Sequence, residues 1–363
     1  MADRQRVAVV GCGSIGRAHL ESYRRAGVEI AAVCDLDRDR LAAAGDEFGV
    51  GRRFERYEDL LAADRYDLVS VCTMPATHRE VAVAALAAGA NVLCEKPPAL
   101  NAAEVAAMIR AAQEAGRFLT FGFNMRYLPN ARILKRFVEA GGLGRPVYTR
   151  AWTFASDIPW WGKHWVKSIS GGGVLASTAV HILDLALWMA GDPRPMTASA
   201  SMTRLFPAKR GGTAPDEASA AAFDVEDTFS GHIRFEDGSW MTLEGGWSYD
   251  RLDYSYSFEM TGERAAIRFD PMQIVSERDG APVDITSEYL APAEQAAATW
   301  QGGWRGAIND EIADVVAAVR DGRAPMVTAR QALTVQATMD ALYRSAEAGL
   351  EVAVEIPVAH AAT

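Results

Sequence analysis

The feature that most constrains the fold is a glycine-spaced turn after the first apolar run of the chain. The stretch "VAVVGCGSIGRAHL" places Gly11, Gly13 and Gly16 in the spacing GxGxxG, between a strand-like and a helix-like run. In such a turn the first glycine allows a tight bend and the second lets the backbone approach a pyrophosphate. The third lets helix and strand pack closely. The stretch therefore predicts a strand–turn–helix unit that binds phosphate groups.

Asp35 extends this to a prediction of dinucleotide binding. It ends the second strand-like run, 19 residues after Gly16. A carboxylate there accepts hydrogen bonds from the ribose hydroxyls of NAD and repels a 2′-phosphate. Ser14 and Ile15, at the expected helix N-terminus, offer backbone N–H groups to the phosphates. We expect NAD as the cofactor and NADP as the less favoured alternative, which Arg38 leaves open.

Strand and helix patterns alternate through the first third of the chain. Apolar runs occur at residues 6–11, 29–35, 68–73, 90–95 and 118–123, separated by alanine-rich helical patterns. This alternation is typical of βαβ units in a doubly wound parallel sheet. We therefore predict an α/β Rossmann domain over residues 1–123.

After residue 123 the pattern changes to strand-like runs joined by turns. These runs lie between residues 146 and 270, among helical patterns near 128–142, 171–190, 305–320 and 328–347. Consecutive strands joined by short turns pair antiparallel. We predict an α+β domain over residues 124–358 with an open, mostly antiparallel sheet.

Composition excludes several classes of protein. With 37 Lys and Arg against 47 Asp and Glu, the net charge is −10 and no basic cluster occurs, so we expect no nucleic-acid partner. The longest apolar runs are too short to span a bilayer, and no signal-like segment precedes the first strand, so we expect a cytoplasmic protein without membrane contact. The four cysteines lack CxxC spacing, and we expect small buried thiols and no bound metal.

Two side chains are candidates for handling a proton. Lys96, in "VLCEKPPAL", ends the fifth predicted strand, where open parallel sheets bind ligands, and the following proline fixes the turn as a trans or a cis peptide. His181 lies in "GGGVLASTAVHILD", and a histidine ordinarily titrates near neutrality. The structural alternatives are a lysine in a surface salt bridge and a histidine satisfied in the core.

Five motifs in order resemble the Gfo/Idh/MocA family of NAD(P)-dependent oxidoreductases. They are the glycine turn with Asp35, "TMPATH" at 73–78, "EKP" at 95–97, "GFNMRYLP" at 122–129 and "GGG…H…D" at 171–184. The resemblance implies a two-domain oxidoreductase whose second domain forms homodimers or homotetramers through its sheet. It also implies site roles: Thr73, Pro75 and His78 line the cofactor groove, Glu95 and Lys96 reach the nicotinamide ribose and the substrate, Asn124 faces the cofactor, Arg126 faces the substrate, and His181 carries the proton.

One position departs from the family pattern. The family commonly has an aspartate four residues before the histidine, and here that residue is Ser177. Positions i and i+4 share a helix face, so we expect Ser177, with Thr178, to meet substrate hydroxyls beside His181. Asp184, three residues after His181, either orients the imidazole or holds its helix against the sheet.

An aromatic and basic loop, "SDIPWWGKHWVKSIS", is the predicted substrate-binding segment. Aromatic faces stack on sugar rings, and cations bind hydroxyls or an acidic group. We expect Trp161, Lys163 and Trp165 to contact a sugar or cyclitol, either neutral or anionic. As the alternative, two of the three tryptophans of this loop belong to the core.

Three functional classes follow from these residues. The first is a dehydrogenase or reductase in which Lys96 and His181 handle the hydroxyl proton. The second is an NAD-dependent glycosidase that works by transient oxidation, elimination, hydration and re-reduction on a neutral or acidic glycoside. The third is a cofactor-bound sensor without turnover, against which the presence of both Lys96 and His181 argues.

The carboxylate of Asp35 generates a prediction about cofactor choice. We expect turnover with NAD to exceed turnover with NADP, because Asp35 repels the additional phosphate. Steady-state rates measured with each cofactor check this expectation. A strong preference for NADP would contradict our interpretation of Asp35.

Overall fold

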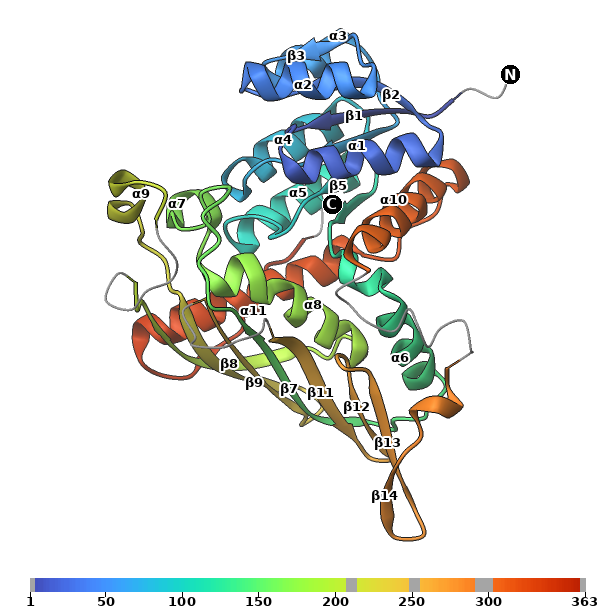
Figure 1. Ribbon diagram of the computed structural model, residues 1–363, viewed down its shortest axis with the longest axis vertical. Coiled ribbons are helices and arrows are strands. Elements are labelled where there is room, and N and C mark those ends of the chain that lie inside the picture. The colour runs from blue at the N-terminus through green and yellow to red at the C-terminus, as the bar shows by residue number, and fades with distance from the viewer. Residues whose placement is uncertain (1–3, 207–213, 248–254, 291–302, 360–363) are drawn as a thin grey trace. The chain divides into compact units, whose positions relative to one another are not determined.

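A computed structural model of the chain describes residues 4–206, 214–247, 255–290 and 303–359 (Figure 1). The chain divides into two compact units. The first comprises residues 1–124, 305–333 and 357–363, and the second comprises residues 125–304 and 334–356. Each unit therefore contains segments that are distant in the sequence.

The first unit is built on a six-stranded sheet in the order β3-β2-β1-β4-β5-β6, with all neighbouring strands parallel. The strand order reverses between β1 and β4, and such a switch point is where doubly wound sheets bind their ligands. The predicted parallel Rossmann sheet is confirmed, and the two-residue strand β3 is an addition that the sequence pattern does not reveal. The strands are β1 (Arg6–Val10), β2 (Glu29–Cys34), β3 (Arg53–Phe54), β4 (Leu68–Val71), β5 (Asn91–Cys94) and β6 (Leu119–Phe121).

Five helices connect these strands, and their ends follow local chemistry. Three of them end at a glycine with left-handed backbone, which closes the last turn without a Cβ clash. The side chains of Asp37 and Asn101 accept backbone N–H groups at the starts of α2 and α5. The helices are α1 (Ser14–Ala26), α2 (Arg38–Phe48), α3 (Tyr57–Ala63), α4 (Pro75–Ala87) and α5 (Ala102–Ala115).

A sixth helix of the first unit comes from near the end of the chain. In α10 (Trp304–Asp321), Ile308, Ile312 and Val315 are buried in the same core cluster as Leu20 of α1 and Val9 of β1. The first compact unit therefore contains later segments in addition to the residues of the predicted division into 1–123 and 124–358. The hydrophobic face of α10 completes the core of the parallel sheet, and sequence order alone does not reveal this pairing.

The second unit is built on a nine-stranded sheet in the order β14-β13-β12-β11-β7-β10-β9-β8-β15. The sheet is mostly antiparallel, as predicted, but β7 lies between β11 and β10 and pairs with β10 in parallel. It is thus a mixed sheet and not a simple meander. The strands are β7 (Pro146–Phe154), β8 (Pro195–Thr203), β9 (Thr228–Phe235), β10 (Trp240–Gly246), β11 (Ser255–Gly262), β12 (Ala265–Arg268), β13 (Gln273–Arg278), β14 (Ala281–Asp284) and β15 (Val352–Ala353).

Helices cover one face of this sheet (Figure 1). Helix α8 (Val180–Met189) contacts β7, β11 and α6 (Pro129–Glu139), and a π-helical turn, η2 (Leu175–Ala179), leads directly into it. The wider π turn replaces the uniform α-helix that the apolar pattern predicts. The remaining elements are α7 (Lys167–Ser170), α9 (Glu217–Ala221), α11 (Ala329–Ala348), whose residues are shared between the units, and the short turns η1 (Asn124–Tyr127) and η3 (Thr286–Glu288).

The stretch Lys167–Met189 is long and apolar enough to cross a membrane by length and composition, although 89% of its most apolar window is buried inside the protein. A core helix passes the same test. Its burial accounts for the apolar character of "VLASTAVHILDLALWM".

An ion pair is buried in the second unit between η1 and α8. Arg126 Nε donates to Asp184 Oδ2 over 2.9 Å, and Arg126 Nη2 donates to Asp184 Oδ1 over 2.5 Å. Neither side chain is more than 1% exposed, and the guanidinium lies 5.6 Å from the ring centroid of Trp188. Burial alone would lower the pKa of Arg126, but the charge of Asp184 more than offsets it. The forked pair joins η1 to α8.

The buried pair generates a prediction about stability. Asp184→Asn leaves the Arg126 guanidinium without its counter-charge, and we expect the free energy of unfolding to fall by about 3–5 kcal/mol. Urea denaturation measures this loss. The exposed control Asp157→Asn should unfold like the wild type, and the double variant Arg126→Met with Asp184→Leu should recover most of the loss. A single variant as stable as the wild type would contradict the ion pair.

Candidate functional site

The glycine turn of the first unit has the geometry of a phosphate cradle. Gly11 has a left-handed φ of 98°, and a Cβ there would lie 2.4 Å from the Cys72 carbonyl oxygen. A Cβ on Gly16 would lie 1.8 Å from the Gly11 carbonyl oxygen, so α1 approaches the turn as closely as backbone allows. At Gly13 the nearest atom, Arg40 Nη1, is 4.0 Å from the Cβ position. The space beside Gly13 therefore suits a pyrophosphate.

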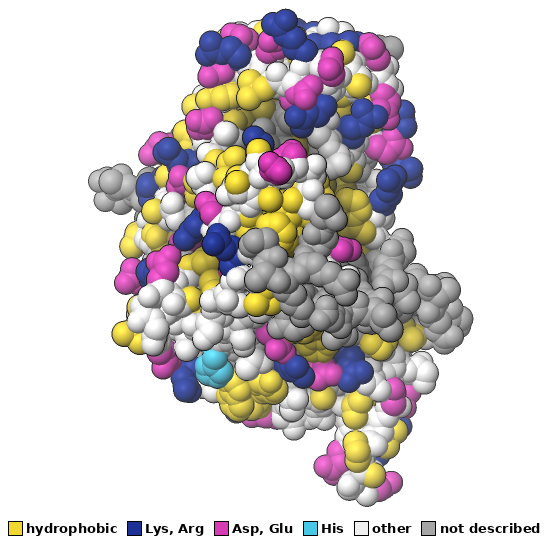
Figure 2. Space-filling view, turned by 60° about the vertical axis from the view of Figure 1, so that its left-hand side comes forward, with side chains coloured by type: hydrophobic (Ala, Val, Ile, Leu, Met, Phe, Trp, Pro, Cys, Tyr) yellow, Lys and Arg dark blue, Asp and Glu magenta, His cyan; other side chains and the backbone are white. Residues whose placement is uncertain are grey.

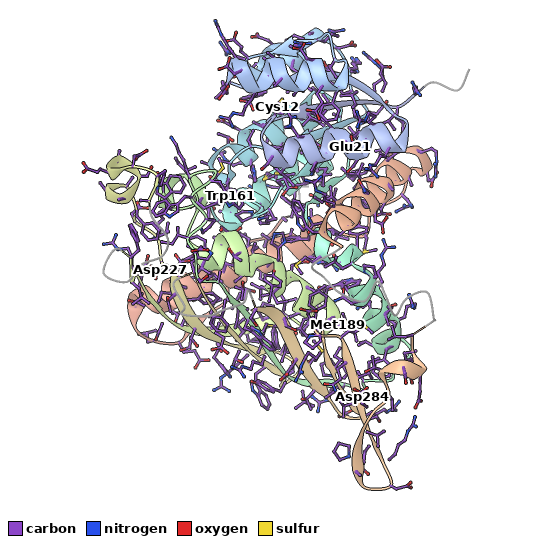
Figure 3. All side chains as sticks on the ribbon, in the orientation of Figure 1. Cys12, Glu21, Trp161, Met189, Asp227 and Asp284 are labelled. Atoms are coloured by element: carbon purple, nitrogen blue, oxygen red, sulfur yellow. The ribbon has the colours of Figure 1, made fainter. Side chains whose placement is uncertain are left out.

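The carboxylate of Asp35 is oriented by two backbone groups. Its Oδ2 accepts the N–H of Cys12 over 2.7 Å, and its Oδ1 accepts the N–H of Asp37 over 2.8 Å. Figure 3 labels Cys12 on the turn after β1. Each carboxylate oxygen accepts more than one hydrogen bond, so both oxygens can also receive a ribose hydroxyl. Together with the cradle, this arrangement fits the diphosphate and ribose of NAD.

The arginine beside the cradle is Arg40, whereas Arg38, which left NADP open as an alternative, lies elsewhere. Arg38 is largely exposed, and its Nε pairs with Glu55 Oε1 over 2.9 Å. Arg40 approaches Gly13 and pairs with Asp37, the residue that caps α2. The capping bond fixes the start of α2 and brings Arg40 to this position, which the sequence spacing does not show.

Among the residues of the "TMPATH" motif, Pro75 is the first residue of α4, a position where its missing N–H costs no hydrogen bond. His78 is 0% exposed, with Nε2 3.0 Å from the Thr73 carbonyl oxygen and Nδ1 3.0 and 3.3 Å from those of Pro97 and Pro98. Burial lowers the pKa of His78, although the three carbonyls favour the charged ring. His78 thus connects two loops of the first unit, whereas we expected it to line the cofactor groove.

Lys96 directly follows β5, and its peptide bond to Pro97 is cis, as the sequence allowed. The Lys96 side chain is partly exposed, whereas Glu95 is only 5% exposed. Burial lowers the pKa of Lys96, and the charge of Glu95 opposes this. Burial alone would raise the pKa of Glu95, but the hydrogen bond and charge of His19, with Lys96, bring it below the usual value. An ionised carboxylate therefore lies beside the lysine.

The Glu95 carboxylate points into the unit, and the expectation that it reaches the nicotinamide ribose is not supported. Its Oε1 lies 3.0 Å from His19 Nε2, and its Oε2 accepts the Lys96 N–H over 3.2 Å. His19 Nδ1 contacts Ser70 Oγ over 3.1 Å, and Ser70 Oγ contacts the Tyr23 hydroxyl over 2.6 Å. The sequence shows His19 only as a histidine in an amphipathic helix, because its partner is 76 positions away.

In the second unit, two of the glycines before η2 allow close packing against Tyr343 and the backbone of Glu226. A Cβ on Gly172 would lie 1.8 Å from the Tyr343 hydroxyl, and one on Gly173 would lie 1.8 Å from the Glu226 carbonyl oxygen. The Glu226 carboxylate accepts the N–H groups of Gly173 and Leu175 and the Tyr343 hydroxyl, over 2.9 to 3.0 Å. Burial raises the pKa of Glu226. This carboxylate anchors the segment that carries His181, a role that sequence reasoning missed.

The residues expected at the substrate lie on η2 and α8. Ser177 is only 6% exposed, and Thr178 accepts a hydrogen bond from Trp247 Nε1 over 2.9 Å. His181, the second residue of α8, is partly exposed. Both oxygens of Asp184 accept from Arg126, which supports the interpretation that Asp184 holds its helix in place.

Two of the expected ligand contacts are buried. Arg126 is 0% exposed within its ion pair, which disagrees with the expectation that it faces the substrate. Asn124 is 3% exposed, and its Oδ1 has no protein hydrogen-bond partner among the described residues. The sequence alone does not distinguish a polar residue that is buried among protein partners from one that contacts a ligand, because both kinds occur close to the ends of strands.

The aromatic loop between β7 and α7 separates into a core and an exposed part. Trp160 packs against Trp165, with ring centroids 5.2 Å apart, and against Phe206 and Phe223. Trp165 is 8% exposed, which favours the core interpretation for this tryptophan. Trp161, labelled in Figure 3, is 60% exposed.

Lys163, two residues after Trp161 on the same loop, is also exposed and has a left-handed φ of 54°. The ring of Trp161 lies 4.4 Å, centroid to centroid, from that of His164. Trp161 and Lys163 are thus the members of the predicted set that remain exposed.

Charges of both signs are mixed on the surface of the described residues that Figure 2 shows. Lysine and arginine side chains lie among aspartate and glutamate side chains on this face. A duplex nucleic acid binds through a continuous positive surface. The visible face, as far as it is described, offers no such surface.

The contrast between Gly13 and Gly16 generates a prediction about the cradle. Gly13→Ala should fold normally, but its methyl group enters the phosphate space, and we expect NAD affinity to fall about tenfold or more, since overpacking a close contact costs about 1–3 kcal/mol. Gly16→Ala should instead lower the melting temperature without cofactor, because its Cβ meets a backbone carbonyl. Calorimetric titration and thermal denaturation measure the two effects. Equal NAD affinity in Gly13→Ala and the wild type would contradict the cradle.

Similar proteins support the architecture of both units. The D-glucoside 3-dehydrogenase of Escherichia coli (strain K12) is 27% identical over 354 residues, which cover 96% of this chain and 97% of the relative. The myo-inositol 2-dehydrogenase of Thermotoga maritima is 28% identical over 292 residues, which cover 78% and 81% of the two chains. The solved structure of GenD2 from gentamicin A biosynthesis, in complex with NAD, has a TM-score of 0.79 at 28% identity, covering 98% of this chain and 97% of GenD2.

Family models cover most of the sequence. The model described as "Oxidoreductase family, NAD-binding Rossmann fold" matches residues 5–123. The model described as "Oxidoreductase family, C-terminal alpha/beta domain" matches residues 135–354. The cradle and Asp35 lie in the first match, and His181 lies in the second. The chain therefore belongs to the Gfo/Idh/MocA family of oxidoreductases and carries its NAD-binding Rossmann domain.

Proposed function

We propose that the protein is an NAD-dependent dehydrogenase or reductase that acts on a carbinol of a sugar, a sugar derivative or a cyclitol. The observation that carries the proposal is Lys96, fixed at the carboxyl end of β5 in the NAD-binding unit by the buried Glu95. The names of the two relatives described above, a glucoside dehydrogenase and an inositol dehydrogenase, support polyhydroxylated rings as the substrate class.

The first unit holds the cofactor in this proposal. The space at Gly13 receives the pyrophosphate at the N-terminus of α1, and the Asp35 carboxylate receives the ribose hydroxyls. Bound NAD supplies the hydride acceptor for an oxidation and, in reduced form, the hydride for the reverse reaction. The chain itself must then handle the hydroxyl proton.

Lys96 and His181 share that task. The Lys96 ammonium hydrogen-bonds the reacting hydroxyl and stabilises the negative charge that develops on its oxygen. His181 accepts the hydroxyl proton while the carbinol C–H bond breaks with its electron pair as hydride, and a carbonyl group forms. In the reverse direction the same histidine returns the proton. Ser177 lacks the charge of the aspartate common at its position, so Lys96 and His181 carry the proton chemistry between them.

The exposed Trp161 and Lys163 are the substrate contacts that we propose on the loop after β7. A tryptophan face that is 60% exposed suits the C–H face of a sugar ring, and the Lys163 ammonium suits a hydroxyl or an anionic substituent. Ser177 and Thr178 are the proposed hydroxyl partners on η2. The aromatic core of Trp160 and Trp165 supports this loop.

We also propose that the protein forms a homodimer or homotetramer through the sheet of the second unit. Trp240 of β10 is 38% exposed, and its ring lies 5.5 Å, centroid to centroid, from that of Tyr148 on β7. Large aromatic residues that remain exposed on a sheet are typical of interfaces. This pair supports the sheet as the contact surface.

The two proton-handling residues generate a prediction about catalysis. Lys96→Ala and His181→Ala should each still bind NAD but lose about 10²- to 10⁴-fold in kcat, the usual contribution of a positioned acid or base. Absorbance of the reduced nicotinamide measures turnover with myo-inositol and with methyl glucosides, neutral and acidic.

His232→Ala is the matched control, because His232 is a partly exposed histidine on β9 of the same unit as His181. It should keep wild-type turnover. A His181→Ala variant with the wild-type rate would show that His181 is structural. Cleavage of glycosides without net NADH formation would replace the proposed dehydrogenase with a redox-neutral glycosidase.

A further inference from the structure

We propose that His19 is a positioning residue that fixes the Lys96 turn through the carboxylate of Glu95. The inference deepens the proposed function and rests on it, since it assumes that Lys96 contacts the reacting hydroxyl. Neither the glycine turn nor the "EKP" motif includes His19. His19 is 0% exposed on the inner face of α1, where it contacts Glu95. Local sequence patterns do not predict this contact, because the two residues are 76 positions apart.

The hydrogen bonds connect four buried side chains of the first unit in one network. An ionised carboxylate only accepts, so His19 Nε2 carries a hydrogen and donates to Glu95 Oε1 over 3.0 Å. His19 Nδ1 contacts Ser70 Oγ over 3.1 Å, and Ser70 Oγ contacts the Tyr23 hydroxyl over 2.6 Å. Each polar side chain from Tyr23 to Glu95 therefore has a hydrogen-bond partner within the network.

The position of the carboxylate is closely defined. A Cβ on Gly122 would lie 2.7 Å from Glu95 Oε1, so the backbone after β6 closes one side. Glu95 Oε2 accepts the N–H of Lys96, which ties the side chain to the turn. His78 holds the next part of the turn through the carbonyl oxygens of Pro97 and Pro98. Two buried imidazoles therefore bind the segment on either side of Lys96.

The charge of Glu95 connects this geometry with the chemistry of Lys96. His19 favours the ionised form of Glu95 by donating to it, and Glu95 favours the ammonium form of Lys96. Without the His19 donor, Glu95 would be protonated more readily and would lose its fixed place at the turn. The network itself contains the titratable side chains of His19 and Tyr23 on α1. The other titratable groups around it are Cys72 after β4, His78 on α4, Cys94 on β5, Lys96 directly after β5, and Glu311 on α10.

Two substitutions of similar size separate positioning from simple packing. In His19→Gln the amide nitrogen can reach the place of Nε2 and donate to Glu95. In His19→Asn the shorter amide can contact only Ser70 at the place of Nδ1. Ser22→Ala is the control, because it removes a partly buried hydrogen bond from the same helix, from Ser22 Oγ to Asn309 Oδ1, without affecting Glu95.

The first measurement does not need a substrate. Competitive labelling with acetic anhydride across a pH series, read by peptide mass spectrometry, gives the midpoint at which Lys96 becomes reactive. We expect the wild type, His19→Gln and Ser22→Ala to share one midpoint and His19→Asn to move to lower pH. A midpoint in His19→Asn that equals the wild type, or lies at higher pH, overturns the proposal.

The second measurement is turnover. With a polyol that the wild type oxidises, we expect kcat of His19→Asn to fall about tenfold or more, the factor that corresponds to losing a hydrogen bond to a charged group, and His19→Gln to retain most activity. The acid limb of the pH profile should move to higher pH in His19→Asn, because Glu95 loses the donor that favours its ionised form. Equal rates and profiles in the two variants overturn the proposal.

The two measurements distinguish a failure of the proposed function from a failure of the role proposed for His19. If the wild type oxidises no polyol, the proposed function fails, and the labelling midpoints still decide whether His19 acts on Lys96. If His19→Asn does not fold, Ser70→Ala replaces it, since it deletes only the hydroxyl that orients His19 and should shift the midpoint in the same direction. An unchanged midpoint in Ser70→Ala then overturns the proposal.

Discussion

The close approach of α1 to the turn after β1 is the constraint on which the rest of the first unit depends. Because Gly16 has no Cβ, the helix backbone lies against the Gly11 carbonyl. One turn further along the same inner face, His19 reaches across the sheet to Glu95 at the end of β5. The close packing of α1 that shapes the phosphate cradle therefore also brings the His19 imidazole within hydrogen-bond distance of Glu95, next to Lys96. Cofactor binding and the support of Lys96 share a single structural origin.

The second unit secures its helix by different means. There the Glu226 carboxylate accepts backbone N–H groups at the start of η2, and the Arg126–Asp184 pair holds α8 further along. Charged groups that are buried and fully paired cost much when one partner is removed, so they define one arrangement of the segment. His181 lies between these two anchors in the sequence. Its placement within the unit is therefore determined from both sides.

Much of this architecture follows from local sequence patterns. The parallel sheet, the helices of the first unit, the cradle glycines and the position of Lys96 could be predicted, because strand–helix alternation and glycine spacing act over a few residues. The interior orientation of Glu95, the burial of Arg126 and the insertion of β7 between β10 and β11 could not. Each depends on a partner distant in the sequence, such as His19 for Glu95 or Asp184 for Arg126. Local patterns specify elements, and long-range pairings decide which polar groups face a ligand.

The origin of α10 has a consequence for how the chain folds during translation. Ile308 and Ile312 fill the core under β1 and α1, yet the ribosome makes them only after nearly the whole second unit. Until then the nascent Rossmann sheet has one apolar flank in water, where chaperones or neighbouring chains can bind it. The N-terminal segment therefore cannot complete its core in order of synthesis, because α10 follows most of the second unit in the chain.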